Sequence, residues 1–258
     1  MRVLLLALTF CLFSLPAAAF NLGVKETAVT LPDHLGTAVL YTPRWAIKTR
    51  PGVIVVHEWW GLNDYARHRA RQLAEAGYPA IAVDMYGTGQ VAEHPDNAMA
   101  FMNAALQAPD KMNARFDAAR TILETDGNAD RHRIYAIGYC FGGAVVLNQA
   151  RMGKDLAGVA SFHGSLGTQS PAQPGAVKAR VLVATGGADP MVPPEQVGAF
   201  AQEMATAGVD LQLLSFPGVQ HSFTNPGSTA LGQQFNMPLA YDEAADTTSW
   251  NALMEFIR

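Results

Sequence analysis

The sequence Gly138-Tyr139-Cys140-Phe141-Gly142-Gly143 directly follows the strand-like run 133–137 and has the spacing of a nucleophile elbow. Such an elbow is a sharp strand-to-helix turn that exposes one side chain, and it closes only where the neighbouring side chains are nearly absent. The run 144–150 can continue as a helix, so Cys140 would stand near a helix N-terminus, where the dipole favours a thiolate. The alternative interpretation is a small buried cysteine before a glycine-rich turn.

On both sides of this elbow the chain alternates predicted strands and helices. The continuous β-branched run 53–56 is typical of a strand that is buried on both faces of a parallel sheet. We expect further strands at 79–83, 133–137, 157–162, 180–184 and 211–216, and helices at 65–76, 95–125 with a break near Pro109, 194–207 and 247–257. This alternation predicts an α/β fold with a mostly parallel, twisted sheet and helices on both faces.

The segments before this alternating region have a different pattern. Residues 24–31 and 36–41 nearly alternate in polarity, and the short segment 32–35 separates them, so they predict a half-exposed antiparallel hairpin. Residues 42–52 contain two prolines and are expected to form a loop. Because no repeat or linker interrupts the chain, we expect one domain over residues 20–258.

Composition and charge indicate a globular protein without a nucleic-acid partner. The chain has 258 residues, 49% of them hydrophobic and 16% charged, which is ordinary for a globular protein with one sizeable core. The net charge is -4 and the 18 Lys and Arg residues are scattered along the chain. A polyanion-binding surface needs clustered positive charge, so we expect no nucleic-acid partner.

The N-terminus has the pattern of a secretory signal peptide. Met1 and Arg2 form a basic start, residues 3–15 are apolar, and the small residues 17–19 follow Pro16. A membrane anchor needs roughly 20 apolar residues, more than this run provides. We therefore expect cleavage after Ala19, export to the periplasm or the medium, and no membrane association of the mature protein.

Cleavage would leave a single cysteine, because Cys11 lies inside the apolar run. One cysteine excludes an intramolecular disulfide, so Cys140 either pairs across chains or is kept as a free thiol. Its position at the elbow favours a reactive thiol.

Polar residues follow several of the predicted strands. Ligands of such sheets bind beyond the carboxyl ends of the strands, and the segment 57–61, Cys140, Asp189 and His221 all stand there. The order Cys140, Asp189, His221 is that of the nucleophile, acid and histidine on an α/β-hydrolase sheet. Cys140 would attack as a thiolate, His221 would accept its proton, and Asp189 would orient the imidazole.

With these residues the chain resembles the dienelactone hydrolase family, α/β-hydrolases that use a cysteine nucleophile. The resemblance implies hydrolysis of a small-molecule ester or lactone without a cofactor. The matching stretches span nearly the whole mature chain and are His57-Glu58-Trp59-Trp60-Gly61, Asp84-Met85-Tyr86, Gly138-Tyr139-Cys140-Phe141-Gly142-Gly143, Gly187-Ala188-Asp189 and His221-Ser222-Phe223.

The resemblance also implies further site residues. A glutamate at the position of Glu58 contacts the cysteine in the resting enzyme, and substrate displaces it. Because a nearby carboxylate disfavours a thiolate, Glu58 would keep Cys140 in its less reactive form until substrate arrives. The backbone N–H groups of Phe141 and Trp59 would form the oxyanion hole.

The chain departs from the family in how it would hold a substrate carboxylate. Dienelactone hydrolases use arginines, one of them four residues after the catalytic histidine, where this chain has Asn225. The region 90–112 contains Lys111 and no arginine. We therefore expect a more apolar acyl or lactone substrate, in a pocket formed with Trp60, Tyr86, Phe223 and Asn225.

Two other motifs have simpler explanations. His57-Glu58 begins like a zinc-protease helix, but the position of the second histidine is Gly61, so we expect no metal. His163-Gly164-Ser165-Leu166-Gly167 resembles a serine elbow, but His163 replaces its first glycine and no long helix follows before Pro171. We interpret it as a loop after a strand.

Two alternative functions remain open on the sequence. One is an exported binding protein that kept the fold without the chemistry, although Cys140, Asp189, His221 and Glu58 are all present. The other is a thiol redox or sensor role for Cys140, which would need a partner thiol because the mature chain has no resolving cysteine. Whichever function holds, including ester or lactone hydrolysis, we expect a monomer or a small homo-oligomer.

Overall fold

The computed structural model describes residues 23–45, 49–87 and 89–258. The predicted signal peptide, residues 1–19, lies outside these ranges. No helix within them is long and apolar enough to cross a membrane.

A single sheet of eight strands runs through the described residues, in the spatial order β1-β2-β4-β3-β5-β6-β7-β8. The strands are β1 (Val24–Leu31), β2 (Gly36–Pro43), β3 (Arg50–Val56), β4 (Ala80–Val83), β5 (Ala129–Tyr139), β6 (Gly158–Phe162), β7 (Arg180–Gly186) and β8 (Leu211–Phe216). The pairs β1–β2 and β2–β4 are antiparallel, and all other pairs are parallel. The predicted α/β fold, with an N-terminal hairpin beside a parallel sheet, is confirmed.

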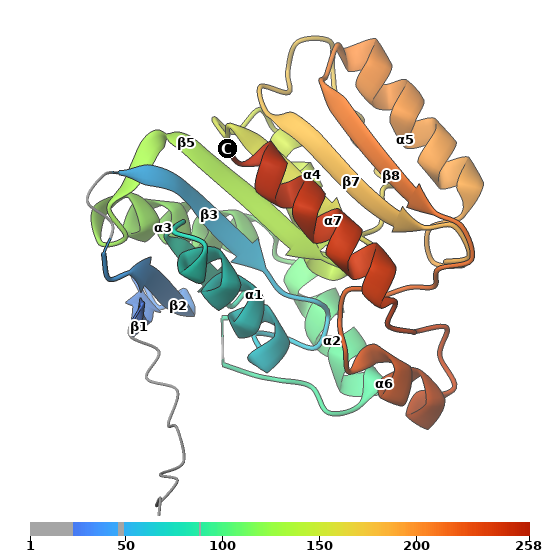
Figure 1. Cartoon of the computed structure of the whole chain (residues 1–258), viewed down its shortest axis with the longest axis horizontal. Coiled ribbons are helices and arrows are strands. Elements are labelled where there is room, and N and C mark those ends of the chain that lie inside the picture. Colours follow the sequence, from blue (N-terminus) through green and yellow to red (C-terminus); the bar gives the residue numbers. More distant parts are fainter. Residues whose placement is uncertain (1–22, 46–48, 88) are drawn as a thin grey trace, which may run out of the picture.

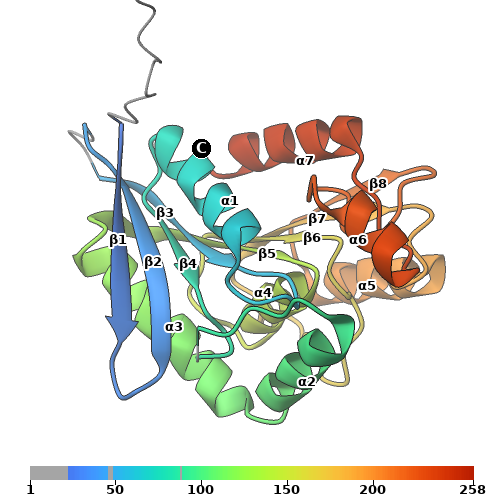
Figure 2. The same cartoon turned by 90° about the horizontal axis from the view of Figure 1, so that it is seen from below.

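Helices cover both faces of this sheet (Figure 2). The helices on one face are α1 (Asp64–Glu75) and α7 (Glu243–Phe256), and those on the other are α3 (Pro109–Thr125), α4 (Phe141–Arg151) and α5 (Pro194–Ala207). Successive strand side chains point to opposite faces. Val53 and Val55 therefore pack under α1, whereas Ile54 and Val56 pack under α3 and α4.

Two more helices lie beyond the carboxyl ends of the parallel strands (Figure 1). They are α2 (Pro95–Leu106) and α6 (Ser228–Phe235). The break between α2 and α3 falls just before Pro109, as the sequence predicts. The sequence pattern does not indicate α6, because that helix has only 8 residues and no side-chain cap to mark its start.

Several elements are longer than their sequence patterns indicate. β3 begins at Arg50 rather than 53, and its register shifts between Pro51 and Gly52. Proline and glycine are tolerated in a strand at such irregularities, but in sequence they resemble a loop. α7 begins at Glu243 rather than 247, because the Asp242 side chain accepts from an N–H of its first turn.

Candidate active site

Cys140 occupies the turn between β5 and α4. Its backbone has φ 52° and ψ -114°, a conformation that costs a non-glycine residue about 1–3 kcal/mol. Hydrogen bonds hold the turn: the Cys140 N–H donates to the Phe162 carbonyl at 3.0 Å, and the Gly142 N–H to the His57 carbonyl at 3.1 Å. The half-buried thiol therefore stands at the N-terminal end of α4, where the helix dipole favours a thiolate.

Glycines let the turn approach its neighbours closely. A Cβ on Gly138 would lie 2.0 Å from the Gly142 carbonyl oxygen, and a Cβ on Gly142 would lie 2.3 Å from the Val56 carbonyl oxygen. A Cβ on Gly143 would lie 2.4 Å from Ser161 Oγ. No side chain fits at any of these distances, so the glycine pattern of the elbow has a steric cause.

His221 and Asp189 follow β8 and β7 at the same end of the sheet. His221 Nδ1–H donates to Asp189 Oδ2 at 2.7 Å, and both residues are buried. His221 Nε2 has no hydrogen-bond partner within the described part of the chain. Cys140 and His221 line one cavity, so the structure brings the three predicted triad residues together.

The surroundings of His221 favour its charged form. Burial lowers its pKa, but the charge of Cys140 and the hydrogen bond that His221 donates to Asp189 outweigh burial and raise the pKa to about 10. A histidine whose charged form is favoured in this way can accept a proton from a neighbouring thiol, as the predicted role of His221 requires.

Removing the thiol should lower this pKa. In Cys140→Ala we expect the titration midpoint of His221 to fall by about one pH unit or more, because an opposite charge nearby typically shifts a pKa by about that much. The measurement is a pH titration of the imidazole nitrogens by NMR in both proteins. A midpoint that stays within about 0.3 units would contradict the pairing of Cys140 with His221.

Glu58 lies just after β3 and is fully buried. Ser222 Oγ donates to its Oε1, and Asn225 Nδ2 donates to its Oε2 at 2.7 Å. Burial raises the pKa of Glu58, although both hydrogen bonds and the charge of His221 oppose that rise. Both of these hydrogen bonds come from the loop after His221, and the contact of Glu58 with Cys140 that the resemblance implies stays a prediction.

The predicted oxyanion-hole donors are Trp59 and Phe141. Neither backbone N–H donates to a backbone carbonyl within the described residues. His57 fixes the first donor: Met85 N–H donates to its Nε2 at 3.1 Å, so its Nδ1 carries the proton and donates to the Glu58 carbonyl at 2.5 Å. That carbonyl shares a planar peptide group with the Trp59 N–H, which therefore points the opposite way. In the sequence His57 matches only the start of a zinc-protease motif, and nothing there predicts its orienting contact.

A cavity of about 500 Å³ opens above Cys140, between α2, α4 and the segment after α6. Among the described residues, no Asp, Glu, Lys or Arg lines it. Most of the lining side chains are apolar, and the lining residues are Trp59, Met99, Met102, Leu106, Cys140, Phe141, Ala144, Asn148, Ser165, Gly167, Met191, Val192, His221, Met237 and Leu239. The cavity therefore suits an uncharged, apolar ligand.

The four predicted pocket residues lie outside this cavity. Trp60 packs against Phe235, with ring centroids 6.2 Å apart, and Tyr86 donates its hydroxyl proton to the Trp59 carbonyl at 2.7 Å. Phe223 is fully buried in the core under α1 and α7. Asn225 binds Glu58 instead of facing the cavity.

A buried arginine that the sequence analysis missed holds the loop after His221. Arg69 Nη2 donates to the Thr224 carbonyl and to Asp246 Oδ1 of α7, both at 2.5 Å. Thr224 Oγ1 lies 2.5 Å from the Tyr65 hydroxyl and 2.7 Å from His163 Nε2. In sequence Arg69 is one of several basic residues of α1, and nothing there separates it from its exposed neighbours.

Comparison with known proteins places these features in a family context. The family model of the dienelactone hydrolase family matches residues 37–258. Protein usf of Aquifex pyrophilus is 26% identical over 84% of this chain and 90% of its own length. The Salmonella typhimurium protein named "Putative carboxymethylenebutenolidase" is 27% identical over 93% of this chain and 88% of its own length.

Solved structures agree with the sequence matches. The dienelactone hydrolase-like promiscuous phosphotriesterase P91, from metagenomic libraries, is 32% identical, with a TM-score of 0.83 over 91% of this chain and 98% of that chain. The structure titled m3DLH is 33% identical, with the same TM-score and coverage.

Proposed function

Since this chain belongs to the dienelactone hydrolase family, a family of hydrolases acting on ester or lactone bonds, we propose that it cleaves uncharged carboxylic esters or lactones through Cys140. The observation that carries the proposal is the hydrogen-bonded pair of His221 and Asp189, whose free Nε2 lies with the Cys140 thiol in one apolar cavity. The same geometry favours hydrolysis over a binding role, because a protein without chemistry has no need for it.

In the first half of the reaction, His221 Nε2 takes the thiol proton and the thiolate attacks the carbonyl carbon. The N–H groups of Phe141 and Trp59 donate to the oxygen that becomes negative. When the tetrahedral intermediate collapses, the bond to the alkoxy oxygen breaks, and that oxygen takes the proton from His221. The product is an acyl thioester on Cys140, with free alcohol, or with the opened chain of a lactone.

The second half of the reaction releases the acyl group. His221 removes a proton from a water molecule, whose oxygen attacks the thioester carbonyl. The same N–H groups stabilise the second tetrahedral intermediate, Cys140 leaves as the thiolate, and His221 returns a proton to it, which restores the thiol. Asp189 keeps Nδ1 protonated throughout, so that Nε2 is the nitrogen that exchanges protons.

The role of Glu58 in this scheme is that of a buried charge close to the reacting pair. Its carboxylate is held by Ser222 and Asn225, both in the loop that carries His221. We propose that it keeps this loop in place and, as a negative charge, opposes thiolate formation on Cys140 until a substrate is bound.

A substrate panel tests the substrate class. We expect the protein to hydrolyse neutral aryl esters and neutral lactones with a kcat/KM at least about tenfold above that for a lactone bearing a carboxylate, because the cavity lining has no cation to pair with the carboxylate. The assay follows phenolate release or lactone opening at matched concentrations. A preference for the carboxylated lactone would contradict the proposal.

A neutral phosphotriester belongs in the same panel. The structural relative P91 is described as a promiscuous phosphotriesterase, and it shares 32% identity with this chain. A phosphotriester is uncharged, which is the kind of ligand that the apolar lining favours. Turnover of it below that of the esters would support ester hydrolysis as the main activity.

We further propose that the protein is exported, on the pattern of residues 1–19. The mature protein should then begin at Phe20 and be recovered outside the cytoplasm. Fractionation of a Gram-negative host, with N-terminal sequencing of the recovered protein, checks both statements. A variant without residues 2–19 should stay in the cytoplasm, and cytoplasmic recovery of the full-length chain would contradict export.

A further inference from the structure

His163 lies directly after β6, in the segment 163–167 whose sequence resembles a serine elbow. The structure has neither helix nor strand there, so the segment is the loop that the sequence indicates. His163 is fully buried and has φ 42°. This φ lies in the left-handed region, which is unfavourable for a residue with a side chain, and such strain is retained mainly at functional sites.

The imidazole of His163 packs against the imidazole of His221. The two ring centroids lie 5.2 Å apart, and the ring planes are inclined at 68°. Among the residues that the structure describes, His163 is the one aromatic side chain that packs against the His221 ring in this way. On its other sides the His163 ring lies 5.2 Å from Phe223 and 6.0 Å from Tyr139, centroid to centroid. The ring thus connects the aromatic core to the proposed base.

His221 needs support on the side of its ring that carries Nε2. Its backbone carbonyl accepts from the Ala240 N–H at 3.1 Å, and its Nδ1–H donates to Asp189. Both bonds hold the side of the residue that is nearer the backbone, and they leave the ring able to tilt about Nδ1. Because Nε2 must reach the thiol and then water, a tilt would slow proton transfer, and a misplacement of about 1 Å can lower a rate about 100-fold.

A chain of hydrogen bonds fixes where the proton of His163 lies. Arg69 Nε lies 3.3 Å from the Tyr65 hydroxyl oxygen, and a guanidinium can only donate. The Tyr65 hydroxyl proton is therefore left for Thr224 Oγ1, which lies 2.5 Å away. Thr224 in turn donates its hydroxyl proton to Nε2 of His163 at 2.7 Å. The imidazole thus accepts at Nε2 and carries its single proton on Nδ1.

His163 is therefore a neutral ring beside a histidine that becomes cationic in the proposed reaction. Burial holds the pKa of His163 well below its usual value, and the charges of His221 and Arg69 lower this pKa further. A second cation here would repel the imidazolium of His221, whereas a neutral ring can lie against it. Nδ1 has no hydrogen-bond partner within the described residues, which is a second unfavourable feature beside the strained backbone.

We propose that His163 is a positioning residue for the base: its neutral ring holds the imidazole of His221 so that Nε2 stays directed toward Cys140. The hydrogen bond from Thr224 keeps the ring neutral, and the contact between the rings does the positioning. The inference rests on the proposed ester hydrolysis at Cys140 and adds to that site a residue outside the triad.

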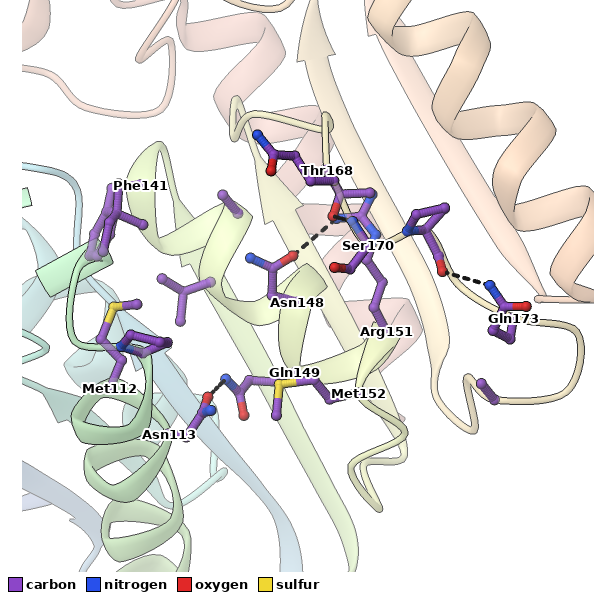
Figure 3. Close-up of a pocket in the computed structure, with 17 residues that line it drawn as sticks. Met112, Asn113, Phe141, Asn148, Gln149, Arg151, Met152, Thr168, Ser170 and Gln173 are labelled. Carbon is purple, nitrogen blue, oxygen red and sulfur yellow. Dashed lines mark hydrogen bonds between the residues drawn. The ribbon is translucent and has the colours of Figure 1, made fainter. Parts of the chain in front are cut away.

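His163 should affect proton transfer without affecting substrate binding. It lines neither the cavity above Cys140 nor a second cavity, which lies between α4 and the loop 168–176 (Figure 3). His221 serves both halves of the proposed reaction, so a displaced ring slows acylation and deacylation together. We therefore expect variants of His163 to lower kcat and to leave KM within about twofold of the wild-type value.

Two substitutions separate the ring contact from the hydrogen bond. His163→Gln places an amide oxygen near the position of Nε2, so it can accept from Thr224, but it has no ring. His163→Phe keeps a neutral ring and has no acceptor. We expect kcat for p-nitrophenyl acetate to fall about tenfold or more in His163→Gln and less than about threefold in His163→Phe. A role limited to anchoring the loop through Thr224 predicts the opposite order.

Phe256→Gln is the matched control for the loss of a buried ring. Phe256 is buried and makes a similar contact with Tyr135, with ring centroids 5.8 Å apart and planes inclined at 71°. It lies beside Gly158 at the start of β6, at the opposite end of the sheet from Cys140. Phe256→Gln should lower the urea midpoint, as His163→Gln does, but keep kcat within about twofold of the wild type.

Nitrogen NMR tests the neutral ring without an activity assay. In the wild type, Nε2 of His163 should have the chemical shift of an unprotonated nitrogen, and this shift should stay constant from about pH 5 to about pH 8. An imidazole of His163 that becomes protonated in this range would contradict the neutral ring on which the proposal depends.

The kinetic outcomes separate the two proposals. If the wild type hydrolyses no ester, the proposed function is wrong, and the positioning role with it. If the wild type is active and His163→Gln keeps at least as much kcat as His163→Phe, the positioning role is wrong while ester hydrolysis stands. A fall of kcat in Phe256→Gln as large as in His163→Gln would also contradict the role. Should His163→Gln not fold, His163→Leu takes its place, because it differs from His163→Phe only in lacking the ring.

Discussion

Cys140→Ala should lose about 10⁴-fold or more of the kcat/KM for a neutral aryl ester. Removing the nucleophile of a triad leaves only substrate binding and oxyanion stabilisation, and losses of this size are typical. His221 keeps its bond to Asp189 in the variant but has no thiol proton to accept. The measurement is steady-state hydrolysis of p-nitrophenyl esters at equal enzyme concentration.

Two further measurements distinguish the loss of the nucleophile from misfolding of the variant. Alanine keeps the Cβ of cysteine at φ 52°, so the turn should be no more strained than before, and the urea midpoint should be close to that of the wild type. Cys140→Ser should retain measurable activity, because a hydroxyl can also give its proton to His221. Retention of more than about a tenth of the activity in Cys140→Ala would place the nucleophile elsewhere.

Gly138→Ala is expected to have the largest effect on stability, lowering the free energy of unfolding by about 3 kcal/mol or more. The new methyl group would lie 2.0 Å from the Gly142 carbonyl oxygen and 2.6 Å from the Gly143 nitrogen. Both contacts are with backbone, so no side chain can rotate away, and β5 and α4 must separate. Urea unfolding gives the change in stability, and ester hydrolysis should fall with it because Cys140 moves too.

Gly198→Ala is the matched control for this substitution. Gly198 lies within α5, and among the described residues no atom beyond its chain neighbours and the adjoining backbone of its own helix lies within 4 Å of the position that its Cβ would take. Alanine is favoured over glycine inside a helix, so this variant should be more stable by about 0.5–1 kcal/mol. Equal stability of Gly138→Ala and the wild type would refute the steric account of the elbow.

Much of the fold follows from local pattern. The β-branched run 53–56 and the alternating segments 24–31 and 36–41 predict their strands, because burial on two faces or on one leaves a distinct periodicity. The sequence pattern does not show the full length of a strand where proline and glycine interrupt it, as Pro51 and Gly52 do in β3. α6 was missed because a helix of 8 residues spans barely two turns.

The candidate site likewise has a part that the sequence predicts and a part that it does not. The residues Cys140, Asp189 and His221 could be predicted because each follows a strand, and the ends of parallel strands meet at one edge. The cavity could not, because its walls come from α2 and from the segment after α6, whose placement depends on tertiary packing. The prediction that Trp60 and Phe223 line the pocket rests only on their aromatic side chains. In the structure both side chains pack into the core.

Arg69 has a consequence for the order in which the site is assembled during synthesis. It ties the loop that carries His221 to Asp246 of α7, 12 residues before the C-terminal Arg258. A ribosome completes the turn around Cys140 more than a hundred residues before it reaches Asp246. The nascent chain therefore contains its thiol well before α7 is made, and we expect full reactivity only once α7 has docked and Arg69 holds the loop that carries His221.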